Sequence, residues 1–157
     1  MFRCKLMIKL LIWSVLIIYM LIIFGLSAQE AFKSHSLSTS IAGKISPYIM
    51  KIESWLGLET TPVPQLNYRL RKLTHFFEYF LLAVLLFIAL SFLQMKYRLK
   101  IAVVLIICII YAVFDEIHQL FVPGRAPGIK DIFIDSSGAV LAVLLIYMIR
   151  LLKGRAH

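Results

Sequence analysis

Long runs of apolar residues, separated by shorter polar segments, dominate the pattern of this chain. Four of these runs are long enough for a helix to cross a hydrocarbon layer about 30 Å thick, which takes about 20 residues. Backbone groups inside a bilayer must bond within their own segment, and the runs lack the alternation of a barrel strand. The pattern therefore predicts an all-α fold, a four-helix transmembrane bundle in a single domain of residues 1–157. Its membrane helices are expected at residues 6–26, 73–93, 101–121 and 132–152.

The long segment between the first two runs, residues 27–72, carries a second kind of pattern. Apolar residues recur there at helical spacing, with charged residues on the other faces: Ile41, Ile45, Ile49, Ile52 and Leu56. The segment therefore predicts an amphipathic interfacial helix, which would bury its apolar stripe in the membrane interface. Pro47 is expected to kink this helix or to divide it in two. Periodicity alone leaves open whether the helix is a lid over a site or a structural cover.

The first run has an alternative interpretation as a secretory signal peptide. Basic residues precede it and the small residue Ala28 follows it, as in such peptides. Its apolar part, however, is longer than the usual length of about 7–15 residues. Leu26 also fits poorly at the position two residues before a cleavage site. We therefore expect this run to be retained as a membrane helix.

Basic residues flank the runs on one predicted side of the membrane. They precede the first run, connect the second to the third, and follow the fourth: Arg3, Lys5, Lys9, Lys96, Arg98, Lys100, Arg150, Lys153 and Arg155. By the positive-inside rule these short segments are cytoplasmic, which predicts an N-in, C-in topology and an extracytoplasmic segment 27–72. Further basic residues within that long segment weaken the contrast between the two sides.

Composition agrees with a membrane setting. Hydrophobic residues make up 61% of the chain, against about 45–50% in soluble proteins. The formal net charge of +9 suits anionic lipid head groups, and nucleic acid is not an expected partner, because binding it takes a basic recognition fold. Cys4 and Cys108 lie at different predicted depths, so neither a disulfide nor a cysteine metal site is expected.

Acidic and histidine side chains gather in the last three runs. The second run starts at the outer face, the third ends there and the fourth starts there, so these side chains share the outer leaflet. At about 100° per residue, the polar groups of each helix also share one face. Exposing a charge to the centre of a bilayer costs about 2.5–3.5 kcal/mol, so the faces should converge on one polar pocket. Its expected residues are His75, Glu78, Tyr79, Asp115, Glu116, His118, Gln119, Arg125, Asp131 and Asp135.

The turn before the fourth run places Arg125 among prolines and glycines. Its planar guanidinium suits a ligand carboxylate or phosphate. The alternative is an internal ion pair with Asp131 or Glu116. Within the fourth run, the small residues 136–138 should let this helix pack closely against a neighbour.

Three blocks of this sequence resemble the VanZ-like family of bacterial membrane proteins. They are "KLTHFFEYF" from Lys72, "DEIHQLFVPGR" from Asp115 and "DIFIDSSG" from Asp131. The stretch "FGLSAQEAFKSHSLS" from Phe24 also resembles the family, so the likeness covers most of the chain. The family takes its name from glycopeptide-resistance clusters, in which its member is associated with low-level teicoplanin resistance. The resemblance implies a cell-envelope role in the bacterial plasma membrane.

The resemblance also bears on the expected pocket. Residues that match the family pattern are His75, Glu78, Asp115, Glu116, Gln119, Arg125 and Asp131. Where the family often carries an asparagine, this chain has Asp135. The departure adds a negative charge that requires a proton or a cation.

Three interpretations of the pocket remain open at this point. In the first, which we favour, it binds or shields a lipid-linked cell-wall precursor or a lipoglycopeptide entering from the membrane lipid, and so contributes to glycopeptide resistance. In the second, the protein is a membrane-embedded enzyme that modifies an amphiphilic envelope substrate. In the third, the polar groups only satisfy one another and fix the helix register.

The enzyme interpretation draws on histidine and carboxylate groups as acid and base. Its candidate catalytic residues are His75, Glu78, Asp115, Glu116 and His118. A divalent metal ion would be held by His75, Glu78 and His118 with an aspartate, because imidazole and carboxylate suit such ions. The chain lacks HExxH, G-x-S-x-G and Gly-rich phosphate-loop motifs, so the catalytic signal is weak.

Overall fold

The computed structural model describes residues 2–29, 31–125 and 128–155. This part of the chain forms the helices α1 (Phe2–Ser27), α2 (Ala31–Trp55), α3 (Val63–Leu90), α4 (Tyr97–Gln119) and α5 (Ile129–Arg155). All of them except α2 are long and apolar enough to cross a membrane. The predicted all-α bundle with a separate amphipathic helix is confirmed, and the chain is an integral membrane protein.

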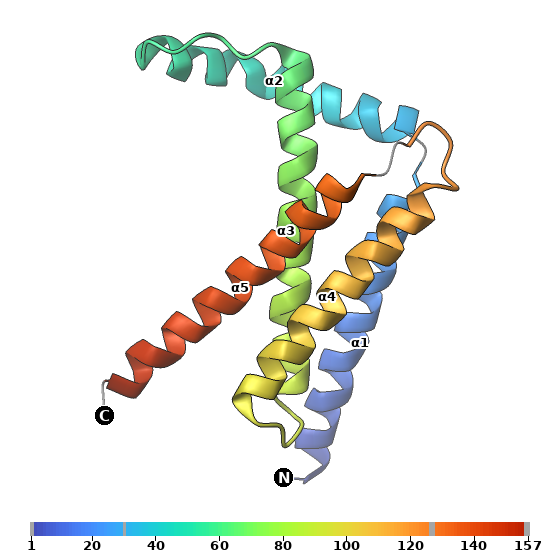
Figure 1. The fold of residues 1–157 in the computed structure, drawn as a ribbon, viewed down its shortest axis with the longest axis vertical. Helices are drawn as coiled ribbons and strands as arrows, with labels where there is room; N and C mark the ends of the chain where they lie inside the picture. The colour runs from blue at the N-terminus through green and yellow to red at the C-terminus, as the bar shows by residue number, and fades with distance from the viewer. Residues whose placement is uncertain (1, 30, 126–127, 156–157) are drawn as a thin grey trace.

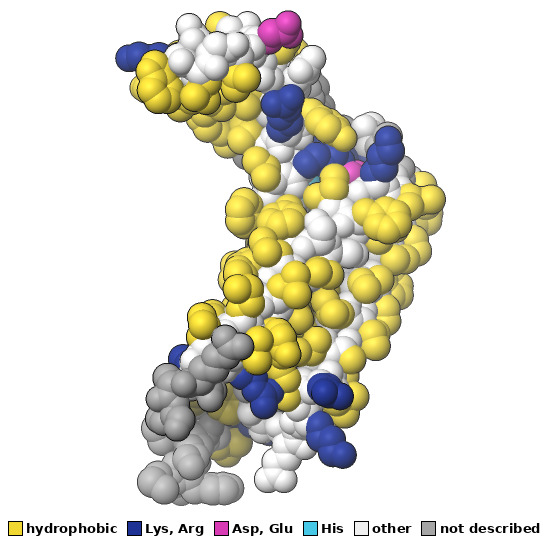
Figure 2. Space-filling view, turned by 60° about the vertical axis from the view of Figure 1, so that its left-hand side comes forward, with side chains coloured by type: hydrophobic (Ala, Val, Ile, Leu, Met, Phe, Trp, Pro, Cys, Tyr) yellow, Lys and Arg dark blue, Asp and Glu magenta, His cyan; other side chains and the backbone are white. Residues whose placement is uncertain are grey.

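Helix α3 is the centre of the assembly, because it contacts each of the other four helices. Figure 1 shows α1 running from the N-terminus to the far end of the bundle, where α2 lies across it. Helix α3 then returns, α4 runs back toward α2, and α5 returns again, so the two termini lie at the same end. Figure 2 shows hydrophobic side chains over the middle of the molecule and basic side chains toward both ends, as a bilayer requires.

Helix α1 is held to the bundle by two partly buried tyrosine contacts. The Tyr19 hydroxyl donates a hydrogen bond of 3.0 Å to the backbone carbonyl of Glu78 in α3. The Tyr111 hydroxyl of α4 donates one of 2.6 Å to the carbonyl of Met20. Both bonds satisfy polar groups within an otherwise apolar region, where an unpaired hydroxyl would cost free energy.

Helix α2 is longer than the apolar stripe predicts, and Pro47 lies inside it without dividing it. Small residues face the bundle, since Ala42 and Ser46 are buried. The predicted stripe residues Ile41 and Ile52 remain exposed on a neighbouring face. Packing therefore uses one face of α2, while the adjacent apolar face is available to lipid.

Helix α3 begins at Val63, well before the expected residue 73, after Pro62. A proline at the start of a helix costs little, because its missing N–H has no partner there in any case. The additional turns extend above the apolar run, and Asn67 of these turns donates a 2.8 Å hydrogen bond to Thr39 of α2. Apolarity marks only the part of a helix inside the membrane, so it underestimates the length of this one.

The connection from α2 to α3 is fixed by Glu53. Thr61 donates to its carboxylate twice, from the hydroxyl at 2.6 Å and from the backbone N–H at 2.9 Å. These hydrogen bonds, the hydroxyl one above all, lower the pKa of Glu53. The charged form of the carboxylate is therefore the one that holds the connection.

The closest helix crossing joins α5 to α3. A Cβ atom added at Gly138 would lie 2.0 Å from the backbone oxygen of Phe76. Completely buried alanines continue the same kind of contact along both helices: Ala83, Ala89, Ala139 and Ala142. Small residues let two backbones approach without a gap, and the predicted close packing is confirmed at Gly138, while Ser137 is exposed.

Replacing Gly138 by alanine should separate α3 from α5, because the obstructing atom at Phe76 is backbone and cannot rotate away. We expect a loss of about 1–3 kcal/mol in the free energy of unfolding, typical of overpacking. Thermal unfolding in detergent measures it. Gly25→Ala is the matched control, since nothing lies within 4 Å of its added Cβ. Equal melting temperatures for the two variants would contradict the close crossing.

Glu53 should make the α2–α3 connection sensitive to acid. Because the pKa of Glu53 is lowered, the stabilisation from its carboxylate is complete above the ordinary pKa of such a group, near 4. It is lost as the pH falls through the pKa of Glu53 in the folded protein. We expect hydrogen-exchange protection at residues 58–61 to fall on acidification in the wild type. Glu53→Gln should remove this pH dependence, and Glu59→Gln, at an exposed neighbour, should keep it. An unchanged profile in Glu53→Gln would show that the carboxylate charge is irrelevant there.

Candidate functional site: a polar cluster beneath α2

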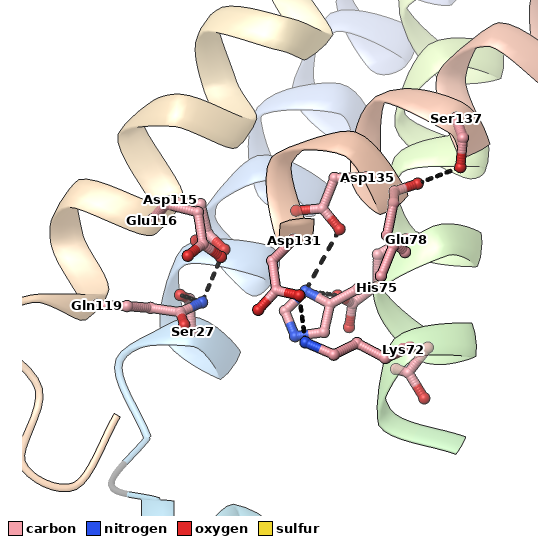
Figure 3. Close-up of polar contacts among 12 residues, drawn as sticks. Ser27, Lys72, His75, Glu78, Asp115, Glu116, Gln119, Asp131, Asp135 and Ser137 are labelled. Carbon is pink, nitrogen blue, oxygen red and sulfur yellow. Dashed lines mark hydrogen bonds and ion pairs between the residues drawn. The ribbon is translucent and has the colours of Figure 1, made fainter. Parts of the chain in front are cut away.

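Polar side chains from three membrane helices meet at the end of the bundle that α2 crosses. Figure 3 shows His75 and Glu78 on α3, Asp115 on α4 and Asp135 on α5 directed toward one region. His75 Nδ1 lies 3.6 Å from Asp135 Oδ1 and 4.0 Å from Glu78 Oε2. Ligand atoms of His75, Asp115 and Asp135 all lie within 4.8 Å of one another. The helices thus converge as the pattern of polar faces predicts.

Some of the predicted residues have structural partners. The amide nitrogen of Gln119 donates to Ser27 Oγ at 3.0 Å and to Asp115 Oδ2 at 3.1 Å. This pair of bonds joins the end of α1 to α4. Ser27 is buried, yet its role has no signal in the sequence beyond its place at the end of the first apolar run.

Two of the predicted acids anchor the loop and the start of α5. Glu116 Oε2 accepts a 2.7 Å hydrogen bond from the backbone N–H of Gly128. Asp131 forms an ion pair with Lys72 of α3, which was not among the predicted site residues. Lys72 lies one helical turn before His75, and this shared helix face could have identified it as a site residue from the sequence.

Two further predicted residues pack against aromatic side chains. Tyr79 is completely buried in the core, with its ring 6.2 Å from that of Tyr111. The His118 ring stacks on Phe24 at a centroid distance of 4.2 Å. Of the predicted metal candidates His75, Glu78 and His118, only His75 belongs to the group that the structure gathers.

Arg125 reaches over the cluster from the loop between α4 and α5. Its Nε donates a 3.2 Å hydrogen bond to the backbone carbonyl of Gln29. Among the described residues it forms no ion pair. The alternative of an internal ion pair with Asp131 or Glu116 is therefore not observed. Burial lowers its pKa, opposed by the charges of the nearby acids. An arginine remains charged under such a shift, so its guanidinium is available to an anion.

A cavity of about 210 Å³ lies between α1, α2, α3 and α4, and its walls differ in character. The wall formed by α1 and α2 is mainly apolar: it contains Ile23, Leu26 and Ile41, with Ser27 and Ser38 beside them. The other is polar and contains His75, Glu78 and Asp115. Arg71 and Arg125 also line it.

A second cavity of about 210 Å³ adjoins the first, and Arg71, His75 and Arg125 line both. It also includes the ion pair of Lys72 and Asp131. Figure 2 shows basic side chains gathered at this end of the molecule, with acidic and histidine atoms visible between them. The basic groups therefore lie around the entrance, while the carboxylates of Asp115 and Asp135 are buried beneath them.

Comparison with known proteins identifies the family. The model of the VanZ/LLP1 family matches residues 12–150, a range that contains the whole cluster, both cavities and most of every helix. Searches of curated proteins and of solved structures found no significant match. The match agrees with the resemblance carried by the three sequence blocks, and the chain belongs to the VanZ/LLP1 family.

Proposed function

We propose that this protein binds a membrane amphiphile with an anionic head group in the cavity beneath α2. The observation that carries the proposal is the division of the cavity into an apolar wall and a polar wall, with Arg71 and Arg125 beside both. An acyl or prenyl chain would lie against Ile23, Leu26 and Ile41. A phosphate or carboxylate head would pair with the guanidinium groups, which suit such oxygens in geometry and charge.

The membership of the chain in the VanZ/LLP1 family supports a narrower form of this proposal. The ligand is then a lipid-linked cell-wall precursor or a lipoglycopeptide, and its binding or shielding contributes to glycopeptide resistance, including resistance to teicoplanin. Both ligand types combine a long apolar chain with a polar head. A cavity that opens beside the hydrocarbon layer suits their entry from the lipid.

The proposed location is the bacterial plasma membrane, with both termini in the cytoplasm. Basic residues at the end opposite α2 support this orientation: Lys96, Arg98, Lys100, Arg150 and Lys153. Part of the basic charge at the α2 end is already engaged, since Lys72 pairs with Asp131. In this orientation the cavity opens in the outer leaflet, where lipid-linked precursors are used and lipoglycopeptides arrive.

Substituting the two arginines tests the proposed head-group contact. Arg71→Gln and Arg125→Gln should each weaken binding of a polyprenyl phosphate by about ten- to hundredfold, because a charge-assisted hydrogen bond contributes about 1.5–3 kcal/mol. Binding to purified protein in detergent can be measured by native mass spectrometry. Arg98→Gln, at the other end of the bundle, is the matched control. Teicoplanin sensitivity of cells carrying the same variants should follow the binding, and equal affinities in all three would refute the contact.

One observation favours a second candidate function, enzymatic modification of the amphiphile. His75 lines the cavity within 4.0 Å of Glu78 and 3.6 Å of Asp135, an arrangement in which imidazole and carboxylate can exchange protons with a substrate. The substrate would be an amphiphilic envelope lipid whose polar head lies beside His75.

His75→Gln separates binding from catalysis. If the protein is an enzyme, incubation with an envelope lipid extract yields a new product by mass spectrometry, and this variant loses most of the turnover while retaining binding. General acid–base groups contribute about 10²–10⁴-fold to rate. Binding by the wild type without any product would leave amphiphile binding as the function and exclude this second candidate.

A further inference from the structure

We infer that His75, Asp115 and Asp135 form a binding site for one divalent transition-metal ion, of the Zn²⁺ or Mn²⁺ class. The residues come from α3, α4 and α5, and one ligand atom of each lies within 4.8 Å of the other two. The inference goes beyond amphiphile binding, because ion binding can be measured without any lipid. It also differs from the trio expected from the sequence, in which Glu78 and His118 accompanied His75.

The unsatisfied carboxylates are the first argument for an ion. Asp135 is 0% exposed, and neither of its oxygens accepts a hydrogen bond from a residue that the structure describes. Asp115 is buried too, and its Oδ1 has no hydrogen-bond partner among these residues. A buried carboxylate without partners is costly, and metal coordination is one of the ways in which proteins satisfy such groups.

The separations are the second argument. His75 Nδ1 and Asp135 Oδ1 are 3.6 Å apart, which is longer than a hydrogen bond. Two ligand atoms at bonds of about 2.1 Å in a tetrahedral site lie about 3.4 Å from each other. That pair already has nearly this spacing. A ligand atom of Asp115 lies within 4.8 Å of the other two, so closing from 4.8 to 3.4 Å takes at most about 1.4 Å.

The surroundings of the three residues suit a coordinated ion. Gln119 donates to Asp115 Oδ2, which orients the carboxylate and leaves Oδ1 free. Hydrogen bonds to metal ligands commonly have this orienting role. Glu78 adds another carboxyl group, whose Oε2 lies 4.0 Å from His75 Nδ1. Lys72, one turn before His75 on α3, pairs with Asp131 and not with these acids.

The donor set determines the class of ion. One imidazole nitrogen with two carboxylate oxygens suits Zn²⁺ or Mn²⁺, whereas Mg²⁺ and Ca²⁺ prefer oxygen alone. An ion bound to three protein ligands keeps a position for another group. Because His75 and Asp115 line the cavity, that position would face the space proposed for the amphiphile head. The ion would provide a further positive charge for a phosphate.

Metal binding to the purified full chain tests the site directly. The protein, carrying no histidine tag, is stripped with chelator in detergent and titrated with Zn²⁺ or Mn²⁺, with Mg²⁺ for comparison. Calorimetry and elemental analysis after dialysis should give about one Zn²⁺ or Mn²⁺ per chain. Asp135→Asn and His75→Gln should weaken binding more than about tenfold, since even the loss of an orienting partner costs about 10–100-fold.

Matched substitutions show whether the loss is specific. Glu59→Gln removes an exposed carboxylate between α2 and α3, and His118→Gln removes the other histidine of the predicted trio. Both should bind as the wild type does, and all four variants should elute as folded protein on size exclusion. Absence of stoichiometric Zn²⁺ or Mn²⁺ in the folded wild type would overturn the inference and leave an ion pair between His75 and Asp135. Equal affinity in Asp135→Asn and Glu59→Gln would overturn it as well.

Amphiphile binding is measured separately on the stripped protein, so that the two proposals can fail independently. Retained polyprenyl phosphate binding without metal binding would reject only the ion. Metal binding without any effect of Arg71→Gln or Arg125→Gln on the lipid would reject only the proposed head-group contact.

Discussion

The approach of α5 to α3 at Gly138 is the constraint on which the polar cluster depends. The added Cβ distance of 2.0 Å to the Phe76 oxygen means that the two backbones are in contact. His75 directly precedes Phe76, and Asp135 lies one turn before Gly138, so the same contact places imidazole and carboxylate side by side. A larger residue at 138 would move the two helices apart and would separate these groups. Close backbone packing and site geometry are therefore one feature of this molecule.

The ionisable groups at this end of the bundle fall into two kinds. Glu116 is bonded to the backbone of the loop at Gly128, and Asp131 is paired with Lys72. These contacts fix the α4–α5 connection and the start of α5. His75, Asp115 and Asp135 retain side-chain atoms without hydrogen-bond partners, although all three belong to helices that cross the membrane. A bilayer penalises such unpaired groups strongly, and the proposed ion would provide them with a partner.

The cavity combines part of this cluster with apolar side chains. Its apolar wall comes from α1 and α2, and its polar wall from α3 and α4, so an amphiphile can satisfy both at once. Helix α2 contributes Ile41 to this wall while it packs on the bundle through Ala42 and Ser46. Its connection to α3 is tied by Glu53 and Thr61. The helix is thus anchored beside the cavity.

The sequence by itself determined the membrane helices, because a run of apolar residues longer than the bilayer is thick has few alternatives. It also determined which residues form polar faces and that these faces share one depth, since helical period and hairpin topology are local properties. Helix ends outside the lipid were less certain, as the early start of α3 at Val63 shows. Only the tertiary structure decided which polar groups pair. It assigned Lys72 to Asp131, placed Tyr79 in the core, stacked His118 on Phe24 and selected Asp115 and Asp135 to accompany His75. These outcomes depend on the rotation and separation of whole helices, which a pattern of residue types along one chain does not encode.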